Sequence, residues 1–75
     1  MTTHDLQDLF LATLLRRIGG NRRRWKTVIG PVRVYDLATH AHCNWSITPN
    51  GASAEIACVE RIADELRLSH PIVSG

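Results

Sequence analysis

The fold of this 75-residue chain is decided by residues 4–18, which read HDLQDLFLATLLRRI. Leucine and phenylalanine side chains recur there at spacings of three and four residues, which is the pattern of an amphipathic helix. Asp5 and Asp8 stand near the start and two arginines stand near the end, as the helix dipole favours. The Gly19-Gly20 pair that follows is a strong helix stop. These signals predict a helix over residues 4–18.

The apolar side chains of this predicted helix spread over a wider arc than a helix needs when only one of its faces is buried. A surface helix of a globular protein needs an apolar stripe of about 100°. Leu11, Leu15 and Ile18 extend the arc well beyond that width. A chain this short has little with which to cover them, and small domains often gain stability by association. These three residues are therefore predicted to form an interface with a second copy of the chain or with another protein.

Three further segments carry secondary-structure signals. Residues 25–35 are rich in β-branched and aromatic side chains and predict a strand, with a break at Gly30-Pro31. Residues 43–48 alternate between apolar and polar side chains, as a half-buried antiparallel strand does. Residues 54–68 follow a turn and show the apolar spacing of a second helix. The sequence therefore predicts one small α+β domain, 1–75, of order α-β-β-α, in which an antiparallel β-hairpin packs against two helices.

Composition excludes several classes of protein. Hydrophobic residues make up 44% of the chain and charged residues 21%, which is ordinary for a globular protein. No apolar stretch reaches the length of a membrane-spanning helix, and the N-terminus lacks the features of a secretory signal. We therefore expect a cytoplasmic protein in which Cys43 and Cys58 are free thiols.

Basic residues are concentrated in the first half of the chain. Residues 1–35 carry seven of the nine Lys and Arg residues against two acidic residues, whereas residues 36–75 carry two against five. Cations beside aromatic rings can contact phosphates while the rings stack on bases. The candidate nucleic-acid-binding residues are Arg22, Arg23, Arg24, Trp25, Lys26, Arg33 and Tyr35. The alternative interpretation is a solvated loop whose arginines keep the end of the first helix soluble and pair with the acidic second helix.

His40 and His42 form a His-x-His pair ahead of the second predicted strand. Imidazole nitrogens suit zinc, which takes three or four ligands around one centre. The remaining ligands would have to come from His4, His70 or another chain. The pair is therefore a candidate zinc site, and the alternative is a polar loop with two ordinary histidines. No other cofactor is expected.

No arrangement of residues typical of catalysis is recognisable. Cys43 adjoins His42, but neighbouring residues of a strand point to opposite faces and do not form a nucleophile–base pair. We therefore expect a non-enzymatic protein-interaction module, and a homodimer. Nucleic-acid binding through the basic segment and metal binding through the histidine pair are the two alternative functions.

Overall fold

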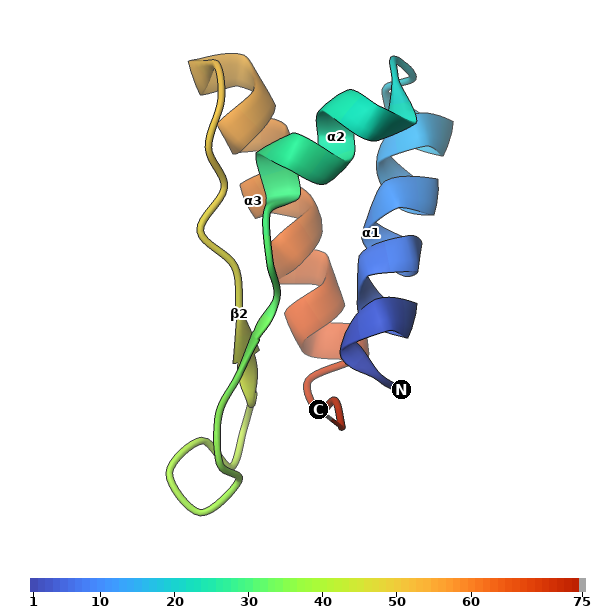
Figure 1. The fold of residues 1–75 in the computed structure, drawn as a ribbon. Coiled ribbons are helices and arrows are strands. Elements are labelled where there is room, and N and C mark those ends of the chain that lie inside the picture. The colour runs from blue at the N-terminus through green and yellow to red at the C-terminus, as the bar shows by residue number, and fades with distance from the viewer. Residues whose placement is uncertain (75) are drawn as a thin grey trace.

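The computed structural model describes residues 1–74, which form three helices and one two-stranded antiparallel sheet (Figure 1). The small α+β class with an antiparallel hairpin is confirmed. The elements, in chain order, are α1 (Thr3–Arg17), α2 (Arg22–Ile29), β1 (Arg33–Val34), β2 (Trp45–Ser46) and α3 (Ser53–Ser69). The order is therefore α-α-β-β-α, with one helix more than the sequence predicts.

Helices α1 and α3 lie where the apolar spacing predicts them. Helix α1 begins with a capping box, in which the Thr2 hydroxyl accepts a hydrogen bond from the Asp5 amide and the Asp5 carboxylate accepts one from the Thr2 amide. The box satisfies backbone donors that the first helical turn leaves without a partner. Helix α3 begins one residue earlier than predicted, and the Glu55 carboxylate accepts a hydrogen bond from the Ala52 amide at its start.

The prediction of a strand over residues 25–35 is wrong for its first half, because residues 22–29 form α2. The Asn21 side chain caps this helix by accepting hydrogen bonds from the amides of Arg23 and Arg24. The helix ends at Gly30, which has a φ of 68° and precedes a proline. Proline disfavours helical backbone in the residue before it, so the Gly30-Pro31 pair acts as a helix stop rather than a strand bulge.

The β-hairpin forms, but its strands are shorter than predicted. Arg33 lies opposite Ser46 and Val34 lies opposite Trp45. The connection between the strands projects beyond the ends of the helices (Figure 1, bottom). The predicted strand 43–48 is reduced to two residues, and the amide of Asn44 bonds instead to the carbonyl of Pro71 in the C-terminal tail.

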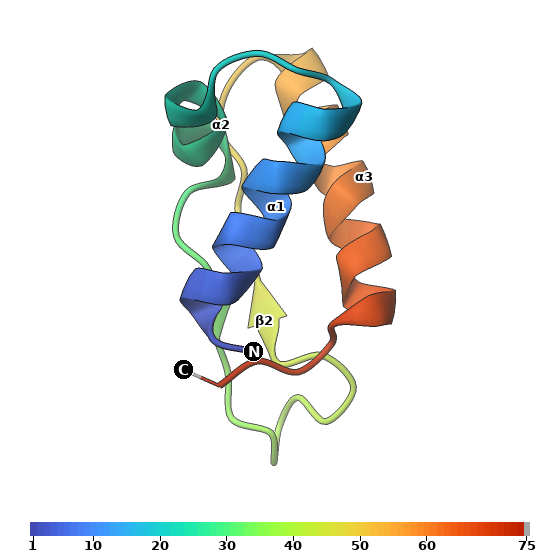
Figure 2. The ribbon, with the colours of Figure 1, turned by 90° about the vertical axis from the view of Figure 1, so that its right-hand side faces the viewer.

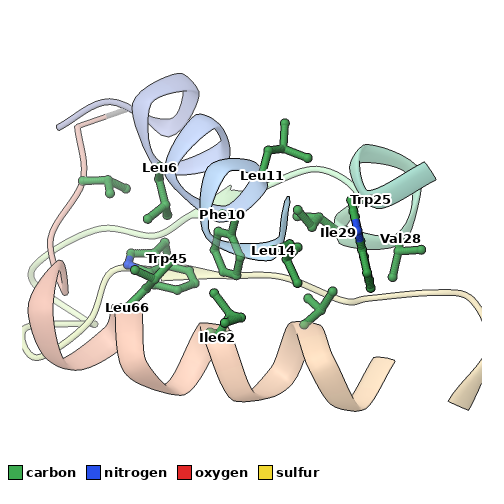
Figure 3. Close-up of a cluster of buried hydrophobic side chains, with 13 residues drawn as sticks. Leu6, Phe10, Leu11, Leu14, Trp25, Val28, Ile29, Trp45, Ile62 and Leu66 are labelled. Atoms are coloured by element: carbon green, nitrogen blue, oxygen red, sulfur yellow. The ribbon is translucent and has the colours of Figure 1, made fainter. Parts of the chain in front are cut away.

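The core lies between the three helices and the hairpin, and Phe10 of α1 is at its centre (Figure 3). The ring of Phe10 meets that of Trp45 edge to face, with ring centroids 5.7 Å apart. Such a pair is favourable because the positive edge of one ring contacts the negative face of the other. The fully or nearly fully buried apolar residues are Leu6, Phe10, Leu11, Leu14, Trp25, Val28, Ile29, Trp45, Val59, Ile62, Ala63, Leu66 and Val73.

The C-terminal tail closes the core at the lower end of the molecule, where it crosses beside the N-terminus of α1 (Figure 2). The buried Asn44 side chain accepts a hydrogen bond from the Val73 amide at 2.8 Å and donates one to the Val73 carbonyl at 2.7 Å. The indole nitrogen of Trp45 donates to the carbonyl of His70 at 2.8 Å. These bonds tie the tail to the hairpin.

Asn44→Ala is expected to lower the free energy of unfolding by roughly 2–4 kcal/mol, because it leaves a buried backbone donor and a buried acceptor of Val73 without partners. Urea unfolding followed by circular dichroism measures the change. Asn50→Ala is the matched control, since Asn50 is exposed and its side chain makes no hydrogen bond within residues 1–74. An equal loss in both variants would contradict this role of Asn44.

Candidate interaction surface

The structure places the three predicted interface residues in different environments. Leu11 is only 1% exposed and belongs to the core of its own chain, so the prediction is wrong for this residue. Leu15 is half-buried and packs against the same core. Ile18 is 50% exposed. The reason is α2, which packs against α1 and shares the buried cluster with Leu11. Helix α2 of the same chain thus covers most of the wide apolar arc, so little of the arc is left for another molecule.

Ile18 lies in an open groove between the C-terminal end of α1 and the N-terminal half of α3. The groove has a volume of about 300 Å³ and a mostly apolar lining. We call it the α1–α3 groove; its lining residues are Arg17, Ile18, Ala57, Cys58, Arg61 and Ile62. Directly after Ile18 the chain turns away through Gly19 and Gly20, whose φ angles of 89° and 94° favour glycine. This turn leaves the groove uncovered.

Two arginines flank the α1–α3 groove. The Arg17 guanidinium is bound to the carboxylate of Glu65, one turn further along α3. Arg61 is exposed and makes no ion pair within residues 1–74. The groove therefore combines an apolar floor with an uncompensated positive charge at its rim. Such a site suits an apolar side chain that is carried next to an acidic residue.

Leu68 is a further candidate for an interaction surface and is not among the residues that the sequence predicts for one. It lies near the end of α3 and is 88% exposed, more than any other large hydrophobic residue in residues 1–74. A signal is present in the sequence, since Leu68 falls outside the apolar face formed by Val59, Ile62 and Leu66.

The basic segment does not form the predicted nucleic-acid platform. Trp25 is 7% exposed and its indole nitrogen donates to the carbonyl of Gly19 at 2.7 Å, so its ring is a core element and cannot stack on a base. Arg24 binds Glu55 through two hydrogen bonds, and Arg22 lies 3.3 Å from Asp8. Only the two remaining cations of the segment, Arg23 and Lys26, make no ion pair within residues 1–74.

Arg33 and Tyr35 lie on the hairpin and do not continue a surface that includes Trp25. The Tyr35 ring stacks on the His40 ring with centroids 4.3 Å apart, and its hydroxyl shares a hydrogen bond with Ser46 at 2.9 Å. The predicted alternation fails because residues 22–29 follow a helical period rather than a period of two.

The histidine pair does not gather a metal site. Within residues 1–74 no group of three or more His, Cys, Asp or Glu side chains is placed to hold one ion. His40 is engaged with Tyr35 and with the Thr39 hydroxyl, which lies 2.9 Å from its Nδ1. The third ligand that zinc needs is thus missing beside His40 and His42, and the predicted zinc site is not supported by the geometry.

Comparison with protein-family models, with curated proteins and with solved structures found no match to this chain. Every helix within residues 1–74 is too short or too polar to span a lipid bilayer.

The Arg24–Glu55 ion pair links the basic and acidic halves of the chain through two hydrogen bonds. Glu55 Oε1 accepts hydrogen bonds from Arg24 at 2.6 Å and from the Ala52 amide at 2.9 Å, and Oε2 accepts one from Arg24 at 2.9 Å. The bonds from Arg24, and then that from Ala52, lower the pKa of Glu55 from 4.5 to about 2. The pair joins α2 to the start of α3.

Stability is expected to fall as the pH falls from about 4.5 towards 2, in part because Glu55 becomes protonated. Its pKa is lower in the folded chain than its usual value, so the pair contributes fully above about pH 4.5 and is lost as the pH falls through the folded pKa. Glu55→Gln should lower the melting temperature at neutral pH and flatten this acid dependence. Glu60→Gln is the control, since Glu60 is exposed and makes no ion pair within residues 1–74. Parallel melting curves for the two variants would contradict the prediction.

Proposed function

We propose that this chain is a cytoplasmic, non-enzymatic protein-interaction module that binds through the α1–α3 groove. The observation that carries the proposal is the open groove itself, with Ile18 half-exposed at its wall. Contiguous exposed apolar surface, unlike single scattered hydrophobic residues, commonly marks a site where another molecule binds. The apolar lining of the groove and the exposed Ile18 side chain are contiguous.

The charge around the groove supports a partner of a particular chemistry. Arg61 stands at the rim without an ion pair in residues 1–74, and Arg17 stands on the other side. A partner that presents an apolar side chain next to a carboxylate would fill the hollow and neutralise Arg61. Burial of the apolar side chain would supply most of the affinity, and the charge would favour one orientation.

An amphipathic anion tests the groove without the natural partner. Anilinonaphthalene sulfonate carries apolar rings and one negative charge, and it is expected to bind the groove with a rise in fluorescence. In a ¹⁵N-labelled sample its binding should shift the amide signals of Ile18, Ala57 and Cys58. Ile18→Glu should weaken binding by about tenfold or more, because it replaces an apolar wall with a carboxylate that repels the probe.

The control for Ile18→Glu is Ile72→Glu, which changes an isoleucine of similar exposure in the C-terminal tail. This variant should bind the probe as the unchanged chain does. Amide shifts spread over the core, or equal weakening in the two variants, would show that the probe does not recognise the groove and would overturn the proposal.

Contact with nucleic-acid phosphates is a second candidate function, favoured by one observation. Arg23 and Lys26 are exposed beside an open, shallow depression of about 600 Å³, whose other lining residues are Gly20, Asn21 and Arg22. With Trp25 buried, such a surface would bind the phosphate backbone without reading bases.

If the chain contacts phosphates, we expect it to bind duplex oligonucleotides weakly and without sequence preference. The affinity should decrease steeply as the salt concentration rises. Arg23→Ala should reduce the slope of log K against log salt by about 0.9, which is the contribution of one phosphate. Arg61→Ala removes a cation elsewhere and should leave the slope unchanged. Absence of binding at low salt in a fluorescence anisotropy titration would eliminate this second function.

A further inference from the structure

The outward side of α3 carries an ordered stripe of four exposed residues. These residues, which we call the α3 outer stripe, are Ala57, Arg61, Asp64 and Leu68. At 100° per residue they lie within 60° of one another and opposite the buried face of the helix. In Figure 2 this helix is at the side of the molecule, and no other part of the chain lies outside it. The spacing of four, three and four residues is that of a coiled-coil seam.

The α3 outer stripe is self-complementary when it is read in opposite directions. If two copies of α3 run antiparallel about an axis between Ile62 and Ala63, Leu68 of each copy lies opposite Ala57 of the other. Arg61 of each copy then lies opposite Asp64 of the other. Each contact therefore occurs twice, as two-fold symmetry requires. A large residue meets a small one, and a cation meets an anion.

We propose that the occupant of this surface is a second copy of the chain, with the two α3 helices paired antiparallel along the outer stripe. The inference rests on the proposed function, because it names the partner of the α1–α3 groove. Ala57 and Arg61 belong both to the stripe and to the groove lining. Leu68 of the second copy thus enters the apolar end of the groove, over Ala57 and beside Cys58. The most exposed leucine and the hollow cover each other.

The charges of the monomer fit this arrangement. Arg61 has no ion pair within residues 1–74, and its guanidinium is free to bind Asp64 of the second copy. The Asp64 side chain is 77% exposed although it bonds to Arg67 at 2.9 Å in its own chain, so it has an oxygen available for a second cation. Parallel pairing would instead place Arg61 against Arg61 and Asp64 against Asp64.

The dimer is expected to be weak and reversible. A stable specific interface buries about 1,600 Å² in total, and a seam of four residues on each of two short helices buries less. Sedimentation equilibrium from about 10 to 500 µM should therefore show the average mass rise from 8.4 kDa toward twice that value. Leu68→Glu should hold the mass at that of the monomer without altering the fold. Leu37→Glu, which changes an exposed leucine of the hairpin loop, should dimerise as before.

Charge exchange tests the register of the seam. Arg61→Asp and Asp64→Arg should each weaken dimerisation by tenfold or more, because each single change places like charges opposite one another. The double variant carrying both changes should recover dimerisation, since every pair is again of opposite sign. Glu60→Arg reverses a charge on the same helix outside the stripe and should have little effect.

Disulfide capture tests the direction of the helices. Two chains are prepared with Cys43→Ser and Cys58→Ser, one carrying Ala57→Cys and the other Leu68→Cys. Mild oxidation of the mixture should link the two different chains to each other, whereas parallel helices would link each chain to its own kind.

A constant mass of 8.4 kDa over the whole concentration range would overturn this inference. So would a dimer that tolerates Leu68→Glu, or single charge changes that the double variant does not correct. If the naphthalene probe binds the groove of a chain that stays monomeric, the proposed function stands and only the second copy as its occupant is wrong. If the probe does not bind, the proposed function itself fails.

Discussion

The burial of the wide apolar arc of α1 is the constraint on which the rest of the structure depends. One neighbouring element cannot cover an arc of this width, so α1 must be approached from several directions. Helices α2 and α3 both pack against it, and the hairpin brings Trp45 against Phe10. The arrangement also fixes the tail, because Trp45 and its neighbour Asn44 hold residues 70–73 by hydrogen bonds. The small core is thus closed by segments from the whole length of the chain.

The two long helices could be predicted because their signals are local. Apolar spacing, caps and stops over residues 4–18 and 54–68 are consistent with one another and need no tertiary information. Helix α2 was missed because its tryptophan and β-branched residues are typical of strands. Its helical signal was nonetheless present, since Trp25, Val28 and Ile29 are spaced three and one apart after an Asn cap. The residue types of this segment favour a strand, whereas the spacing of its apolar residues favours a helix. The helix forms because its spacing brings Trp25, Val28 and Ile29 into the same core.

The charged groups that remain free on the candidate interaction surface could not be predicted from the sequence. Which arginines are paired depends on contacts between residues that are distant in the chain. Arg24 is paired with Glu55, 31 positions away, and Arg17 with Glu65, 48 positions away. No local pattern distinguishes these arginines from Arg61, which remains unpaired within residues 1–74. The width of the α1 arc predicts an interface with another molecule at Leu11, which is wrong because α2 packs against α1 and Leu11 is buried within its own chain. What remains uncovered is the end of the arc at Ile18 and the side of α3 beside it.

The two faces of helix α3 differ in how they select the residues that pack against them. Its inner face is continuous and apolar, and its specificity comes from shape, since Val59, Ile62 and Leu66 must fit around α1 and α2. Its outer stripe carries one apolar, one small and two opposite charged residues, so burial alone would not select a partner for it. The order of those residues along the helix determines which partner, and which direction of pairing, is favourable. The small and large residues stand at opposite ends, with the two charges between them, so a parallel copy meets like charges and an antiparallel copy meets opposite ones. A surface with little area can in this way be specific without being strongly adhesive.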